Sequence, residues 1–106
     1  MTVGPLGDLD NVSAADCAVR MANAGASVVG TNCYYDPATT LETLALMKEG
    51  LAKAGLLDKP TYLMAQPLGF NCPDAANTKF GYVPCDYERL NSGNGIILYA
   101  VREMFF

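Results

Sequence analysis

The sequence predicts an α/β fold with a βαβαβ core of parallel strands. Two short runs rich in strand-forming residues, 26–29 and 61–65, are separated by a helix-type pattern, and a second helix-type pattern precedes the first run. A helix of roughly 15 residues between two strands fits the crossover of a parallel pair. The length of 106 residues leaves room for one domain.

The chain begins with residues 1–9, which read as a short strand running into a loop rich in glycine and proline. The first helix is expected to end near Ala24. Ser13 is a suitable N-cap for it, and Asp16 three residues later comes close to a capping box. Cys17 lies on the flank of the apolar face of this helix, so we expect it to belong to the core.

Residues 26–29 are the next expected strand, and Cys33 follows it in a loop. The carboxyl end of a strand is where α/β folds keep their chemistry. Gly30 and Asn32 tolerate unusual backbone angles, and Pro37 blocks a helix from starting before it. This loop can therefore turn sharply and direct the thiol at a cleft. The alternative is that Cys33 is a small buried hydrophobe.

The second helix is expected over Thr40–Ala54. Thr39 and Glu42 form a capping box of the T-x-x-E type before it, and Gly55 marks its end. Its apolar stripe, which includes Leu41 and Met47, reads as core rather than as a cofactor site.

The third strand, 61–65, ends at Gln66 and Pro67. In a parallel sheet the carboxyl ends of the strands share one edge, so Asp8, Cys33 and Gln66 are expected on one face of the fold.

The character of the chain changes from about Cys85 onward. Residues 67–84 read as a loop in which Cys72 is an ordinary thiol. The apolar run 96–101 is either a terminal strand or a short helix, and periodicity does not decide between them at that length.

Composition excludes several classes of function. The net charge of -4 and the pI near 4.5, with scattered basic residues, argue against a nucleic-acid surface. We expect no membrane span and no leader, and hence a cytoplasmic protein. The chain has no histidine, and its four cysteines have no C-x-x-C spacing. Any metal site must therefore use thiolates or carboxylates.

Several blocks, in order and at compatible spacing, resemble the betaine–homocysteine S-methyltransferase family. The motif G-x-N-C at Gly30 is the most specific of them. The blocks are Met1–Asp8, Cys17–Arg20, Gly25–Ser27, Gly30–Cys33 with Asp36 and Pro37, Leu46–Leu51 and Leu63–Leu68. The resemblance runs from residue 1 to roughly residue 82, so we expect a partial homocysteine-binding domain at 1–84 and an unrelated tail at 85–106.

The resemblance implies a partial (β/α)8 TIM barrel in which zinc, held by three cysteine thiolates, activates homocysteine. It implies that Cys33 is a zinc ligand and that Gly30, Asn32 and Gln66 lie at the substrate. It assigns no catalytic residue among them. The implied reaction transfers a methyl group from betaine to homocysteine and gives methionine.

The chain also departs from the family pattern. The adjacent Cys-Cys pair that would supply the other two zinc ligands is missing, and neither Cys72 nor Cys85 reproduces it. A complete barrel needs about 250 residues. One thiolate does not hold catalytic zinc, so we expect the isolated chain to be inactive. The alternatives are a non-catalytic module that docks on full-length subunits, and an unrelated α/β redox domain built on a reactive Cys33.

Overall fold

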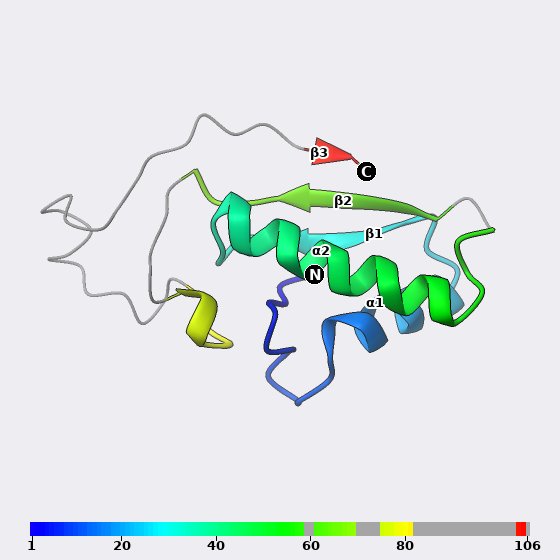
Figure 1. The fold of residues 1–106 in the computed structure, drawn as a ribbon, viewed down its shortest axis with the longest axis horizontal. Coiled ribbons are helices and arrows are strands. Elements are labelled where there is room, and N and C mark those ends of the chain that lie inside the picture. Colours follow the sequence, from blue (N-terminus) through cyan, green and yellow to red (C-terminus); the bar gives the residue numbers. More distant parts are fainter. Residues whose placement is uncertain (59–60, 70–74, 82–103, 106) are drawn as a thin grey trace, which may run out of the picture.

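The computed structural model describes residues 1–58, 61–69, 75–81 and 104–105. Its elements follow one another along the chain as shown in Figure 1. They are α1 (Ala14–Asn23), β1 (Val28–Asn32), α2 (Pro37–Lys53), β2 (Tyr62–Gln66), the 3-10 helix η1 (Ala75–Asn77) and β3 (Met104–Phe105). The predicted α/β class and the order helix, strand, helix, strand are confirmed. The described residues form part of an α/β fold and do not close a barrel.

The three strands form one sheet in the order β1-β2-β3. β1 and β2 are parallel, in a register that pairs Val28 with Tyr62 and Asn32 with Gln66. β3 joins the other side of β2 in the antiparallel direction, with Met104 opposite Ala65. The predicted parallel pair is therefore present, while the antiparallel β3 was not predicted. The run 96–101 lies outside the described residues.

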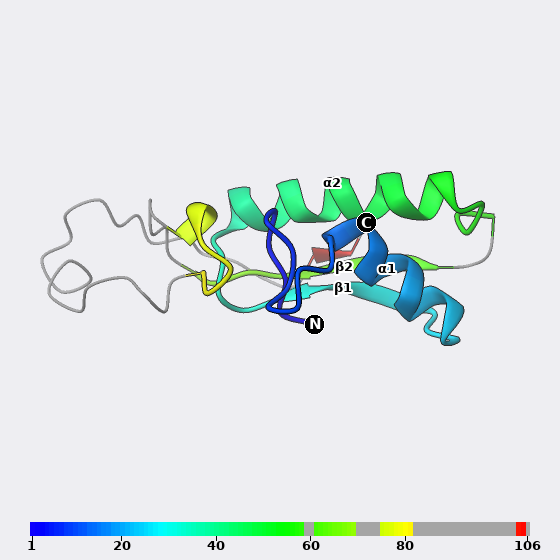
Figure 2. The same cartoon turned by 90° about the horizontal axis from the view of Figure 1, so that it is seen from below.

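Both helices bury an apolar face in one core. In Figure 2, α2 runs along one face of the parallel strands, and α1 packs against α2 and β1. Gly50 allows the close helix contact, because a Cβ there would lie 2.7 Å from that of Ala15. The buried core residues are Val3, Ala14, Cys17, Ala18, Val29, Leu44, Met47, Leu51, Leu56, Leu63 and Ala65. The prediction that Cys17 belongs to the core is confirmed.

Helix α1 begins as its sequence predicts. The Ser13 side chain accepts a hydrogen bond from the Asp16 N–H at 3.0 Å, which satisfies one of the free donors of the first turn. The helix ends at Asn23, one residue before the predicted Ala24, with Ala24 as its C-cap.

Helix α2 starts three residues earlier than predicted, and its N-cap is Asp36 rather than Thr39. The Asp36 carboxylate accepts from the Thr39 N–H at 2.8 Å, and Pro37 occupies the first helical position, where its missing N–H has no cost. Thr39 is buried inside the helix, while Glu42 is exposed. The predicted capping box is therefore wrong, because a better cap lies upstream.

The predicted stripe of α2 needs one further correction. Leu41 is 42% exposed, whereas Leu44, Met47 and Leu51 are buried. Leu41 is therefore less buried than the stripe suggested, although the first turns of the helix are buried through Thr39, Thr40 and Thr43.

The predicted strand over residues 1–9 is not formed. This segment contains only an isolated bridge between Gly4 and Gly7. Met1 nevertheless lies alongside β1, since its amino group donates to the Gly30 carbonyl and its carbonyl accepts from the Asn32 N–H, each at 2.9 Å. The Thr31 hydroxyl adds a hydrogen bond of 2.7 Å to the Val3 carbonyl. The segment pairs with the end of β1 and then turns away.

No helix in the described part of the chain is long and apolar enough to cross a membrane.

Candidate functional site

The candidate site lies at the carboxyl end of the parallel strands. Cys33 is the first residue after β1, and its N–H donates to the Gln66 carbonyl at 3.0 Å. Asn32 pairs with Gln66 in the sheet register. The structure thus brings Cys33 and Gln66 together at one edge, as the sequence predicted, because parallel strands end on the same side, and Asn32 lies beside them.

Gly30 lies inside β1 and not in the loop where it was predicted, since the strand continues to Asn32. Gly30 is buried and pairs with Met64 of β2. A Cβ at this position would overlap the Met64 backbone carbonyl. The position thus requires glycine because the neighbouring strand approaches closely, and not because a loop must turn.

The backbone turns sharply immediately after β1. Cys33 and Tyr34 both have positive φ angles, 62° and 60°, which non-glycine residues adopt rarely. The Asn32 side-chain amide donates to the Cys33 sulfur at 3.1 Å. Cys33 is exposed, so its interpretation as a small buried hydrophobe is wrong. A free thiol with an amide donor beside it is available at the surface.

Asp8 and Cys17 form a separate pair. One carboxylate oxygen of Asp8 accepts from the backbone N–H groups of Asp10 and Val12, at 2.9 and 2.8 Å, which fixes the loop before α1. The other oxygen lies 3.8 Å from the Cys17 sulfur. Burial, and secondarily the charge of Asp8, raise the pKa of the Cys17 thiol. Cys17 is therefore a protonated core thiol rather than a nucleophile.

Sequence reasoning gave no role to Tyr35, which the structure places at the base of the loop. Its side chain is fully buried, and its hydroxyl donates to the Thr78 carbonyl at 2.9 Å. Burial raises the pKa of this phenol. The only available signal was an aromatic residue two positions after the cysteine, and aromatic residues occur as often in ordinary cores.

The donor set needed for zinc is incomplete in the described residues. They contain no group of three or more cysteine, histidine, aspartate or glutamate side chains that could hold a metal ion. Cys33 is a free, exposed thiol at the edge, while Cys72 and Cys85 lie outside the described part of the chain. Since catalytic zinc ordinarily has three protein ligands, these residues do not form a zinc site by themselves.

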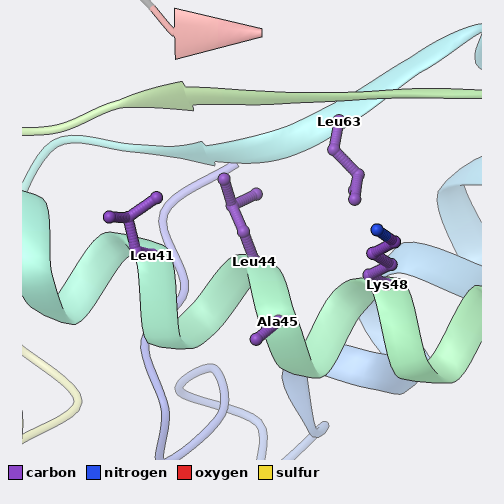
Figure 3. Close-up of a pocket in the computed structure, with 5 residues that line it drawn as sticks. All are labelled: Leu41, Leu44, Ala45, Lys48 and Leu63. Atoms are coloured by element: carbon purple, nitrogen blue, oxygen red, sulfur yellow. The ribbon is translucent and has the colours of Figure 1, made fainter. Parts of the chain in front are cut away.

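An apolar hollow of about 190 Å³ lies between α2 and β2. In Figure 3, Leu41, Leu44 and Lys48 extend from the helix toward the strands, and Leu63 extends from β2 toward the helix. Ala45 completes the lining. None of the predicted site residues lines this hollow, and its walls offer packing surface rather than chemistry.

Comparison with known proteins gives a specific match, although no protein-family model matches the chain. Over 84 residues the chain is 49% identical to betaine–homocysteine S-methyltransferase 1 of Bos taurus and, likewise at 49%, to that of Sus scrofa. It is 48% identical to S-methylmethionine–homocysteine S-methyltransferase of Pongo abelii. Each match covers 79% of this chain but only 20%, 29% and 22% of the respective relative. The predicted resemblance is confirmed: most of this chain is homologous to a segment of the betaine–homocysteine S-methyltransferases, and it spans less than a third of their length.

Proposed function

We propose that this chain is a fragment or truncated isoform of a zinc-dependent homocysteine S-methyltransferase with a (β/α)8 barrel fold. In the complete enzyme a methyl group passes from betaine to homocysteine and gives methionine. The observation that carries the proposal is the exposed Cys33 thiol beside Gln66 at the carboxyl end of β1. It is supported by 49% identity over 84 residues to enzymes named for this reaction.

In this proposal Cys33 contributes one thiolate to the zinc site, and Gly30, Asn32 and Gln66 contribute to the substrate side. Homocysteine and betaine are the proposed substrates. The described residues hold no complete zinc site and the sequence has no adjacent Cys-Cys pair, so the isolated chain is expected to be inactive alone. Residues 1–84 form the partial homocysteine-binding domain, and residues 85–106 form a C-terminal tail outside the family. The location is cytoplasmic, and neither nucleic acid nor a membrane is a partner.

The choice of methyl donor does not follow from sequence identity to the relatives. Relatives named for betaine and relatives named for S-methylmethionine match equally well, at 49% and 48%. A direct assay must therefore compare the two donors.

A chimera gives the sharpest test. The matching segment of the Bos taurus enzyme is replaced by that of this chain, and methionine formation is measured with homocysteine and each donor. We expect activity with betaine, and loss of both bound zinc and activity in Cys33→Ser. Cys17→Ala is the matched control, because Cys17 is a buried thiol of the core. A Cys33→Ser chimera that keeps its zinc and its turnover would contradict the role of Cys33.

The purified 106-residue chain is assayed in parallel and should form no methionine. The intact mass of the endogenous protein, compared with 11.3 kDa, decides between a fragment and a truncated isoform.

The second candidate is a non-catalytic module that docks on full-length subunits. The apolar hollow between α2 and β2 and the exposed Leu41 favour it, because uncovered apolar surface promotes association. Co-purification of the tagged chain with a full-length relative tests this function. Leu41→Asp should abolish the association, and failure of the unmodified chain to co-purify would refute the module.

A further inference from the structure

The backbone is left-handed twice in succession at Cys33 and Tyr34, with φ angles of 62° and 60°. A non-glycine residue adopts this conformation with steric strain, and the conformation persists only where surrounding contacts impose it. The contacts that hold this turn therefore also decide where the Cys33 thiol lies.

The backbone of the next residue, Tyr35, supplies several of these contacts. Its N–H donates to the Cys33 carbonyl at 2.7 Å, which closes a tight turn around Tyr34. Its carbonyl accepts from the Leu68 N–H at 2.9 Å and from the Thr40 hydroxyl at 3.4 Å. Residue 35 is thus tied both to the chain that follows β2 and to the first turn of α2.

The Tyr35 side chain anchors the same residue to two other segments. The fully buried ring lies against Gly4, where a Cβ would overlap it. The hydroxyl donates to the carbonyl of Thr78, 43 residues further along the chain. Because burial raises the pKa of the phenol, it remains a neutral hydrogen-bond donor near pH 7.

Two further contacts hold the ends of the turn. The Cys33 N–H is bonded to the Gln66 carbonyl, and the Asp36 side chain caps α2. These contacts fix the turn to the end of β2 and to α2. The Tyr35 side chain connects the turn to Gly4, to Ala75 of η1 and to Thr78, which directly follows η1.

We propose that Tyr35 is a positioning residue whose buried ring imposes the left-handed backbone of Cys33 and Tyr34 and so holds the Cys33 thiol exposed at the edge of the sheet. The use of that thiol rests on the proposed function, whereas the backbone conformation is measurable without it.

The test is an NMR measurement on the isotope-labelled 106-residue chain. A positive φ brings the amide and Hα protons of one residue close together, so we expect strong intraresidue cross-peaks for Cys33 and Tyr34. Tyr35→Leu should remove both strong cross-peaks, and Tyr35→Phe should retain them because the ring stays. Tyr62→Leu, at a tyrosine that is 58% exposed on β2, is the matched control and should also retain them.

Gly4→Ala is a second perturbation that leaves Tyr35 itself intact. If Tyr35→Leu does not fold, Gly4→Ala alone tests whether the ring imposes the turn. The added methyl group would displace the ring, so both strong cross-peaks should again be lost. Strong cross-peaks for Cys33 and Tyr34 in the folded Tyr35→Leu or Gly4→Ala chain would overturn the proposal. An inactive chimera would overturn the proposed function alone, since the cross-peaks require no substrate.

Discussion

The apolar core and the turn after β1 are stabilised by different kinds of interaction. The core gathers buried side chains of α1, α2 and both parallel strands, and the backbone there follows regular helix and strand geometry. The turn exposes Cys33 on two consecutive left-handed residues and depends on one buried ring and a few hydrogen bonds. The comparison teaches that bulk burial supplies the stability of this chain, while a small set of specific contacts places its reactive group.

The largest difference between the two regions is expected in the alkylation rates of their cysteines, Cys33 in the turn and Cys17 in the core. Alkylation of the native chain should modify Cys33 on the order of 100-fold faster than Cys17, since a buried thiol reacts only after local opening. The raised pKa of Cys17 further lowers its reactive thiolate fraction. Peptide-resolved mass spectrometry measures both rates, and the difference should vanish in denaturant. Equal rates in the native chain would show that the core does not protect Cys17.

Within the core, Leu51→Ala should reduce the free energy of unfolding by about 2–5 kcal/mol, because it leaves a cavity at a fully buried site. Leu41→Ala makes the same change at a position of the same helix that is 42% exposed, and it should cost about 0.5 kcal/mol. Denaturant unfolding of both variants measures the difference. A cost for Leu41→Ala as large as that for Leu51→Ala would mean that the face of α2 is assigned wrongly.

Where the core meets the turn, Gly30→Ala should destabilise the chain by about 1–3 kcal/mol, because the added methyl group overlaps the Met64 carbonyl. Val28→Ala, at an exposed position of the same strand, is the control and should change stability by about 0.5 kcal/mol. Thermal unfolding measures both changes. A neutral Gly30→Ala would leave substrate contact as the reason for glycine at this position.

At the far side of the turn, Asp36→Ala should cost about 0.5–2 kcal/mol, because it removes the N-cap of α2. Glu42→Ala tests the capping box that the sequence suggested, and it should change the free energy of unfolding by about 0.5 kcal/mol. Urea unfolding of both variants measures these two changes in the free energy of unfolding. The opposite ranking would restore Thr39 as the cap.

The smallest effect is expected on the outer face of α2, which belongs to neither region. The Lys53 ammonium lies 2.6 Å from the Glu49 carboxylate and lowers its pKa by hydrogen bonding and by charge. Because the folded pKa lies below the unfolded one, the pair adds stability above the unfolded pKa, and this contribution is lost as the pH falls through the folded pKa.

An NMR titration of Glu49 should show a higher midpoint in Lys53→Gln than in the wild type. Lys48→Gln removes the same charge elsewhere on the helix and should shift the midpoint less. Equal shifts in the two variants would mean that the bond to Lys53 does not lower the pKa.

The sequence by itself determined the features that depend on near neighbours. The N-cap and periodicity of α1, the strand runs, and the position of Cys33 just after a strand all follow from residues within about one helical turn of one another. The edge that joins Cys33 to Gln66 was also predictable, because parallel strands end on the same side. The resemblance to methyltransferases could be recognised from the sequence for a related reason, because it lies in short ordered blocks.

Only the tertiary structure decided the features in which distant segments meet. Thr39 suits a cap as well as Asp36 does until its burial is known, and Gly30 requires glycine only because Met64 approaches it. Tyr35 acquires its role from Gly4 and Thr78, which lie far from it in the chain. Local pattern predicted the two helices and the two parallel strands. Burial and close approach depend on which segments pack together, and a one-dimensional pattern does not contain that information.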